Sequence, residues 1–315
     1  MGTIPRVPSP VVLLSPQRQR PNLSAVLAQL GAEGPYAVVT AGWEEREDEV
    51  GELETHLGQE VTNLRLYARL DEAFAADREL FLAYRERRTR LREQSELYRL
   101  RLAHLAATWY DLGRRAGRLD LIEVERASAV QALRDLDAHQ GGCVAKIVRE
   151  FDAAFRPAER PSLARHVEEV HEALLGAEAV LVAGGNVAVL LNRLRLFGLG
   201  PLLAKRPVFA WSAGAMALSE RVVLFHDTPP QGPGHPEVLD AGLGLFKGLT
   251  PLPHGAARLR LEERERVALF ARRFAPSAPT LLEEGAAVSW NGRAWSTVLG
   301  TPRQLTPEGH VVEAA

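Results

Sequence analysis

Residues 207–218, PVFAWSAGAMAL, predict a short buried strand, a turn made of small residues and the first turn of a helix. Other short apolar runs are flanked by turn residues and alternate with helical patterns along most of the chain. This alternation is typical of βα units around a mostly parallel sheet, so we expect an α/β protein. Strands are predicted at 11–14, 36–40, 61–66, 179–183, 208–211, 222–225 and 286–290, with a small hairpin within 305–312.

One long stretch shows no convincing strand pattern. Residues 70–161 are dense in Arg, Glu, Leu and Ala, which predicts an all-helical insertion. The insertion divides the α/β domain into two parts, residues 1–69 and residues 162–315.

The insertion contains the pattern of a long helix. Apolar side chains at helical spacing line one face of it: Leu80, Tyr84, Leu91, Tyr98, Leu102 and Leu105. Gly113, Gly117 and the pair Gly141-Gly142 indicate where the segment turns back, giving three or four packed helices. We interpret the apolar face as packing within the insertion. The alternatives are a homodimer surface and a lid over the functional site.

Composition narrows the class of protein. The 315 residues are 46% hydrophobic and 25% charged, which is enough to bury a sizeable core. A net charge of −2 and a pI near 6.5 give no overall attraction for nucleic acid or an anionic membrane. Cys143 is the only cysteine, which excludes an intrachain disulfide and a cysteine-rich zinc site. The apolar run at 11–14 is too short for a signal peptide, so we expect a cytoplasmic protein. We also expect that the protein needs no metal or organic cofactor.

Ser212 occupies the turn between the predicted strand at 208–211 and the helix that follows. A serine at such a junction is lifted clear of the sheet, and its small neighbours allow the sharp turn to close. The N-terminus of the helix directs N–H groups toward developing negative charge. This context is that of a nucleophile elbow, and Ser212 is the predicted nucleophile.

A second strand ends in a similar turn. Residues 180–186, VLVAGGN, predict a buried strand followed by a glycine pair and another helix. Glycine permits close approach of the backbone to a ligand. The amides of Gly185 and Ala213 are therefore candidates for an oxyanion hole, with Asn186 as a possible further site residue.

A serine nucleophile requires a base and a group that orients the base. His254, in the rigid turn of TPLPHG at 250–255, is the predicted base, and His226 is its competitor. The orienting group is a carboxylate that fixes the imidazole tautomer. Glu284 lies at a turn after the histidine and Asp227 lies between the serine and the histidine, and spacing alone does not choose between them.

Five short motifs occur together in the order found in a known family: Gly184-Gly185-Asn186, Trp211-Ser212-Ala213-Gly214-Ala215, Gly242-Leu243-Gly244-Leu245, Pro253-His254 and Glu283-Glu284-Gly285. The chain resembles the aspartyl dipeptidase (peptidase E) and cyanophycinase family of serine peptidases over roughly residues 8–67 and 163–300. The resemblance implies the fold of the class I glutamine amidotransferases, a flavodoxin-like three-layer sandwich, here with an all-helical insertion.

The resemblance also implies roles for single residues. It assigns Ser212 as nucleophile, His254 as base and Glu284 as orienting acid, with the amides of Gly185 and Ala213 as the oxyanion hole. Asp227 matches an aspartate that lies near the site in the dipeptidase branch, which favours Glu284 over Asp227 for the triad. The chain departs from the family at Ala210, where glycine is usual, and in its helical insertion.

From these observations we expect a hydrolase that cleaves a peptide bond in a small aspartyl or isoaspartyl peptide through an acyl-enzyme. Arg258 and Arg260, shortly after the base, are candidates for binding an acidic side chain. One alternative is a non-catalytic member of the fold that binds a ligand or partner. Another is an α/β-hydrolase-type esterase that uses Ser212, Asp227 and His254.

Overall fold

The computed structural model describes residues 10–230, 234–283 and 285–314. The strands are β1 (Val11–Leu14), β2 (Tyr36–Val39), β3 (Thr62–Asn63), β4 (Ala179–Val182), β5 (Val208–Trp211), β6 (Arg221–Leu224), β7 (Glu237–Ala241), β8 (Leu249–Pro253), β9 (Ala278–Leu282), β10 (Ala287–Trp290), β11 (Trp295–Leu299), β12 (Arg303–Leu305) and β13 (Val311–Glu313). The α-helices are α1 (Leu23–Leu30), α2 (Gly51–Leu57), α3 (Leu66–Ala76), α4 (Arg78–Arg114), α5 (Leu119–Phe155), α6 (Pro161–Leu175), α7 (Val187–Leu196), α8 (Gly200–Leu203), α9 (Ala213–Leu218), α10 (Gly255–Arg258) and α11 (Arg264–Phe274). Two 3₁₀ helices are η1 (Ala41–Arg46) and η2 (Pro157–Glu159).

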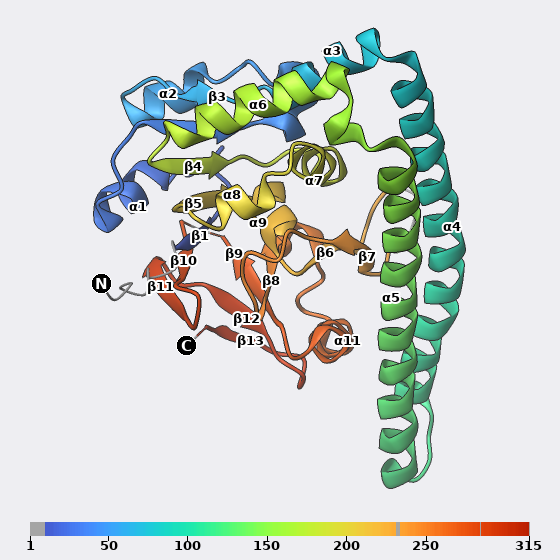
Figure 1. The fold of residues 1–315 in the computed structure, drawn as a ribbon. Helices are drawn as coiled ribbons and strands as arrows, with labels where there is room; N and C mark the ends of the chain where they lie inside the picture. Colours follow the sequence, from blue (N-terminus) through green and yellow to red (C-terminus); the bar gives the residue numbers. More distant parts are fainter. Residues whose placement is uncertain (1–9, 231–233, 284, 315) are drawn as a thin grey trace, which may run out of the picture.

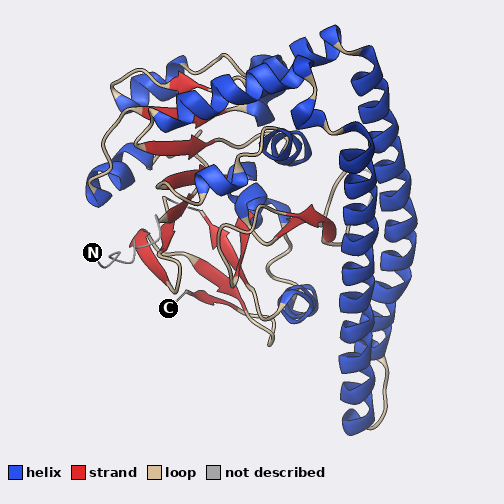
Figure 2. Cartoon of the chain, viewed as in Figure 1, coloured by secondary structure: helices blue, strands red, loops and turns tan. Residues whose placement is uncertain are grey.

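The central sheet has seven strands in the order β11-β10-β1-β5-β4-β2-β3. Strands β1, β5, β4, β2 and β3 are parallel, and β10 and β11 add an antiparallel edge. All four residues of β1, β2, β4 and β5 are buried, because both faces of the sheet are covered (Figure 2). The α/β class with a mostly parallel sheet is therefore confirmed. The parallel strands place Ser15, Thr40, Ala183 and Ser212 at one edge, the carboxyl edge of the sheet.

The predicted strand at 222–225 lies outside this sheet. It is β6, which starts one residue earlier and pairs only with β7 in a two-stranded antiparallel sheet. A third sheet has the order β13-β12-β9-β8 and contains the predicted hairpin as β12 and β13. The segment before His254, strand-like in sequence despite Pro251 and Pro253, is β8, but its place in a separate sheet was not predicted.

Helices α4 and α5 form a long antiparallel hairpin at one side of the molecule (Figure 1). The apolar stripe predicted for the first helix lies on α4, where Tyr98 and Leu102 are each 2% exposed. The chain reverses between Arg114 and Leu119, near Gly113 and Gly117, as predicted. None of the described helices is both long and apolar enough to cross a membrane.

The prediction of a second turn at Gly141-Gly142 was wrong, since both glycines lie inside α5. Each glycine costs a helix about 1 kcal/mol relative to alanine. The packing of α5 along α4 offsets this cost, so the helix continues through the pair to Phe155.

A buried ion pair attaches the hairpin to the α/β body. Arg273 of α11 donates to both carboxylate oxygens of Asp137 on α5, at 2.7 and 2.6 Å, and to the hydroxyl of Tyr98 on α4 at 2.8 Å. A third nitrogen donates to the carbonyl of Pro236 at 2.8 Å. Arg273 is 2% and Asp137 is 4% exposed, so the ion pair is buried away from water and each charge is neutralised by the other.

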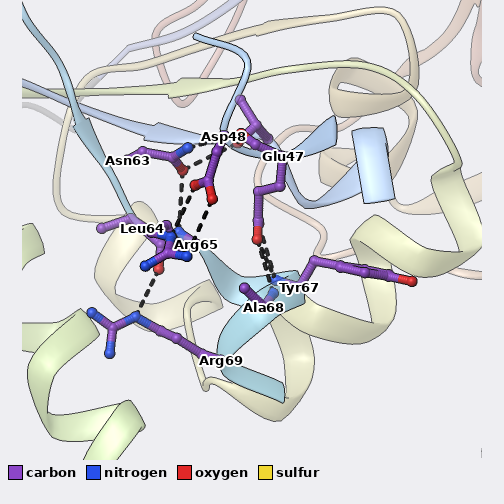
Figure 3. Close-up of polar contacts among 9 residues, drawn as sticks. Glu47, Asp48, Asn63, Leu64, Arg65, Tyr67, Ala68 and Arg69 are labelled. Carbon is purple, nitrogen blue, oxygen red and sulfur yellow. Dashed lines mark hydrogen bonds and ion pairs between the residues drawn. The ribbon is translucent and has the colours of Figure 1, made fainter. Parts of the chain in front are cut away.

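The path from the sheet into the hairpin is fixed by a second buried carboxylate (Figure 3). Both oxygens of Glu47, which follows η1, accept from the amides of Tyr67 and Ala68 in the first turn of α3. Glu47 is 3% exposed, and Asn63 of β3 donates to its carbonyl at 2.8 Å. The carboxylate therefore caps the positive end of α3, which leads directly into α4.

We expect Asp137→Ala to lower the free energy of unfolding by about 3–5 kcal/mol, because it leaves the charge of Arg273 buried and unpaired. Glu150→Ala on the same helix removes the exposed pair with Arg90 and serves as the control, with a loss of about 0–1 kcal/mol. The measurement is urea denaturation followed by circular dichroism. Equal losses for the two variants would show that the buried pair does not hold the hairpin to the body.

Candidate active site

Ser212 lies between β5 and α9, in a backbone conformation that is rare for a residue with a side chain. Its φ is 51° and its ψ is −124°. Two close backbone approaches surround it. A Cβ on Gly214 would collide with the carbonyl of Val182 at the end of β4, and a Cβ on Gly184 would lie 2.7 Å from the Cβ of Ser212. The small residues after β4 and β5 therefore let the two strand ends meet and hold Ser212 at the carboxyl edge of the sheet.

His254 directly follows β8 and lies opposite the serine. Its φ is 57°, in the left-handed region, which places its ring at the end of the strand ahead of α10. Nε2 of His254 lies 3.4 Å from Oγ of Ser212. This distance is within the range seen for nucleophile and base before a substrate is bound, so the structure brings the two predicted residues together.

The environment of His254 favours its neutral form. Burial of one side of the ring lowers the pKa of His254 below its ordinary value, and the guanidinium of Arg258 lowers it further. The carboxylate of Glu283 acts in the opposite direction. A neutral imidazole is the form that accepts a proton from a hydroxyl.

The turn after β4 adjoins the serine. Among the described residues, neither the amide of Gly185 nor that of Ala213 donates a hydrogen bond to the protein. Ala213 is the first residue of α9, where a backbone amide has no intrahelical partner, and Gly185 lies in the turn before α7. Both of the predicted oxyanion-hole donors are thus available at the turns that meet beside Ser212.

Asn186 has a structural role at the start of α7. Its side-chain oxygen accepts from the amides of Ala188 and Val189, which caps the helix. Its side-chain nitrogen donates to Glu44 at 2.6 Å, and its backbone amide donates to Gly42 at 2.7 Å. The loop after β2 therefore packs on the glycine turn.

The predicted orienting acid, Glu284, lies outside the described residues. Its neighbour Glu283 is the described carboxylate whose charge acts on His254, and it accepts from the amide of Ala256 at 2.6 Å. Its other oxygen contacts Arg303 at 3.4 Å. Glu283 is thus a second candidate for the orienting acid.

The carboxylate of Asp227 binds Arg260 and Arg266 and not His254. It is 3% exposed and accepts from the amide of Arg260 at 2.8 Å and from the guanidinium of Arg266 at 2.5 Å. No hydrogen bond joins it to His254 within the described part of the chain. The structure therefore does not bring Asp227 to the base, and the competing base His226 only accepts from the amide of Thr228.

The two arginines predicted to bind substrate differ in their surroundings. Arg260 is paired with Glu263 at 2.8 Å. Arg258 is exposed and forms no ion pair with a described residue, and its charge acts on His254. Arg258 is therefore the cation that remains available beside the base. Among the described residues no group of three or more His, Cys, Asp or Glu side chains is arranged to hold a metal ion.

Two residues near the site were missed by the sequence analysis, Glu44 and Glu283. Glu44 has a φ of 58° and a ψ of −124°, nearly the conformation of Ser212. The small residues at 40–42, directly after a buried strand that ends at the carboxyl edge, are a signal that could have pointed to this loop. Glu283 adjoins the predicted acid, and nothing in the sequence separates the two.

Comparison with known proteins connects this geometry to a family. Residues 144–298 match the model of peptidase family S51. A solved structure titled "Crystal structure of a peptidase from an acI-B1 Actinobacterium" is 12% identical, and the alignment covers 98% of this chain and 97% of that chain with a TM-score of 0.44. No curated protein matches the sequence significantly.

The backbone of Ser212 yields a stability prediction. Holding an L-residue in this conformation costs about 1–3 kcal/mol, and glycine avoids the cost. We expect Ser212→Gly to unfold with a free energy about 1 kcal/mol higher than Ser212→Ala. At Ser219, where φ is −66°, we expect alanine to be more stable than glycine. Thermal or urea unfolding of the four variants checks this, and the same order at both positions would contradict it.

The titration of His254 yields a second prediction. Arg258→Gln removes a charge that lowers the pKa, so the titration should move to higher pH. Glu283→Gln removes a charge that raises it, so the titration should move to lower pH. The measurement is ¹H NMR of the histidine ring protons, with His254→Gln identifying the resonance. Arg293→Gln, in the turn between β10 and β11 at the opposite edge of the sheet, is the control. Shifts of the same sign in the two variants would contradict the assignment.

Proposed function

We propose that this chain, whose residues 144–298 match peptidase family S51, is a serine-type peptidase that hydrolyses an amide bond in small aspartyl or isoaspartyl peptides. The observation that carries the proposal is the 3.4 Å distance between Oγ of Ser212 and Nε2 of His254, at the edge where two free amides meet. The wider resemblance to aspartyl dipeptidases and cyanophycinases, and to the three-layer sandwich of the class I glutamine amidotransferases, belongs to the same proposal.

The reaction begins when His254 accepts the proton of Ser212 as its Oγ attacks the substrate carbonyl. The C–O bond forms and the carbonyl oxygen becomes an oxyanion, which accepts from the amides of Gly185 and Ala213. The protonated His254 then donates to the leaving nitrogen as the C–N bond breaks. Water, deprotonated by His254, attacks the ester and releases the acid and Ser212.

Two adjacent residues, Glu283 and Glu284, are candidates for the acid that orients His254. Glu284 is the acid that the family resemblance implies. Glu283 has the contact with the turn after His254 to support it. A carboxylate in this position holds the imidazole in the tautomer that presents Nε2 to the serine and stabilises the cation that forms.

Substrate choice rests on charge. Arg258 supplies a positive group on the same side as the base, and a guanidinium binds a carboxylate in a two-point fork. An aspartyl side chain or the free carboxylate of a β-linked residue satisfies that fork. Arg260 is engaged by Glu263, so we assign it a supporting role next to Arg258.

The esterase alternative requires Asp227 to orient the base. The contacts of Asp227 with Arg260 and Arg266 weigh against that role, since both carboxylate oxygens already have partners. The described geometry therefore gives this alternative no support.

The test is hydrolysis of a panel of α-aspartyl, β-aspartyl and neutral dipeptides by the wild type and by Ser212→Ala. We expect cleavage of aspartyl members, reduced by at least about 10³-fold in the variant. In the same assay Glu283→Gln and Glu284→Gln are compared. Substitution of the true orienting acid should lower kcat about 10³–10⁴-fold, and substitution of its neighbour should lower it far less. Arg258→Gln should raise KM for acidic members and leave neutral ones unchanged.

Two outcomes would overturn the proposal. Undiminished cleavage by Ser212→Ala would remove the serine from the mechanism. A folded wild type that cleaves no member of the panel, and no longer aspartyl peptide, would leave the non-catalytic binding protein as the better interpretation.

A further inference from the structure

A cavity of about 130 Å³ lies between the helical hairpin and the α/β body. Its walls come from α4, α5, α7 and β7, and neither Ser212 nor His254 lines it. Leu91, Val148 and Leu191 give it apolar walls, and its charged lining residues are Arg87, Asp152, Arg195 and Asp240. The cavity is therefore a space separate from the candidate active site.

Arg87 is an unusual residue within this cavity. It is 5% exposed, and its guanidinium lies over the rings of Tyr84 and Phe151 at 4.8 and 4.4 Å. Its Nε is buried without a hydrogen-bond partner, and it forms no ion pair with a described residue. Burial lowers the pKa of Arg87 below its ordinary value. Withdrawing a cation from water is unfavourable, and within the described chain this is offset in part by the two rings and by the charge of Asp152, without a direct ion pair.

Two other arginines of the same region have carboxylate partners, whereas the buried Arg193 donates to the hydroxyl of Tyr84 at 2.8 Å and, like Arg87, forms no ion pair with a described residue. Arg273 pairs with Asp137 through two hydrogen bonds. Arg195, which also lines the cavity, pairs with Asp240 and donates to the carbonyl of Ala241 at 2.6 Å. Arg273 and Arg195 thus each have a carboxylate within hydrogen-bond distance, and Arg87 has none among the described residues. Asp152 also lines the cavity and its charge acts on Arg87, but it is exposed and forms no ion pair with Arg87.

We propose that the cavity binds a small aliphatic carboxylate whose carboxyl group pairs with Arg87. The planar guanidinium fork matches a carboxylate, and the apolar walls suit a short hydrocarbon chain. An engineered cavity of about 150 Å³ holds benzene, so this space accommodates a ligand of roughly six non-hydrogen atoms. Butyrate has this size and this combination of groups. Inorganic phosphate shares the negative charge but has no apolar part to contact Leu91, Val148 and Leu191.

The ligand would connect parts of the chain that are distant in sequence. Ala188, Leu191 and Asn192 contribute one side of α7 to the cavity, and α7 begins directly after the Gly184–Asn186 turn. Tyr84 of α4 already donates to Asn192 at 2.8 Å. An occupant therefore adds a contact between the hairpin and the helix that follows the candidate oxyanion turn, and it stabilises the folded chain by mass action.

The test is binding of sodium butyrate to the full chain, followed by thermal unfolding and by isothermal titration calorimetry. Sodium chloride at equal ionic strength and inorganic phosphate are the comparison anions. We expect a saturable rise in Tm and a stoichiometry of one with butyrate, and binding at least about tenfold weaker with phosphate. Ser212→Ala should bind butyrate as the wild type does, which separates this site from the active site.

Two variants and one control assign the binding to the cavity. Arg87→Met should lose the butyrate effect, and its own Tm should equal or exceed that of the wild type, since an unpaired buried charge is removed. Ala188→Phe keeps Arg87 and fills the exposed entrance from α7, so it should also lose binding. Arg90→Met, one turn along α4 and exposed, should bind normally.

Several results would overturn the proposal. They are the absence of a saturable effect of butyrate on the wild type, binding retained by folded Arg87→Met or by Ala188→Phe, and phosphate binding as tightly as butyrate. If Arg87→Met does not fold, Ala188→Phe decides alone, because its substitution is at an exposed helix position.

Discussion

The approach of two strand ends, β4 and β5, is the constraint on which the candidate site depends. A side chain at Gly184 or Gly214 would force the two turns apart, and Ser212 would then move away from the carboxyl edge. The turn conformation is costly for a serine and persists because the buried β5 and the buried α9 fix its two ends. The amides of Gly185 and Ala213, in the turns that meet there, donate to no described residue, so the strained turn and the candidate anion site have one structural origin.

The second half of the candidate site comes from a different sheet. His254 follows β8, which pairs with β9 and not with the central strands. Its position relative to Ser212 therefore depends on how α9, β8 and the body pack, and not on a shared strand register. A carboxylate after β9 is well placed to fix this arrangement, because β8 and β9 run parallel and end side by side. Glu283 makes such a contact through the amide of Ala256.

Particular residues show what the sequence could and could not predict. Strands β1, β4 and β5 are continuous apolar runs, because parallel strands covered on both faces have no polar side, and their limits follow closely from the pattern. The glycine turn and the serine turn were recognisable because only small residues fit there. The choice between Glu283 and Glu284 was not predictable, since successive residues at a strand end point to opposite sides and one position decides which carboxylate faces the histidine. The continuity of α5 through Gly141-Gly142 was also hidden, because it depends on tertiary packing against α4.

Two buried arginines where the hairpin meets the body have different surroundings. Arg273 has a full set of acceptors, which fixes α4, α5 and α11 relative to one another. Arg87 lies over aromatic rings and forms no ion pair with a described residue, although a leucine or methionine would fill a similar volume without the cost of a buried charge. The proposed carboxylate ligand would explain why this position holds an arginine and not a hydrophobic residue. Helix α7 forms one wall of that cavity and starts at the turn beside Ser212. A carboxylate bound to Arg87 would therefore also strengthen the contact between the hairpin and the helix that follows the candidate oxyanion donors.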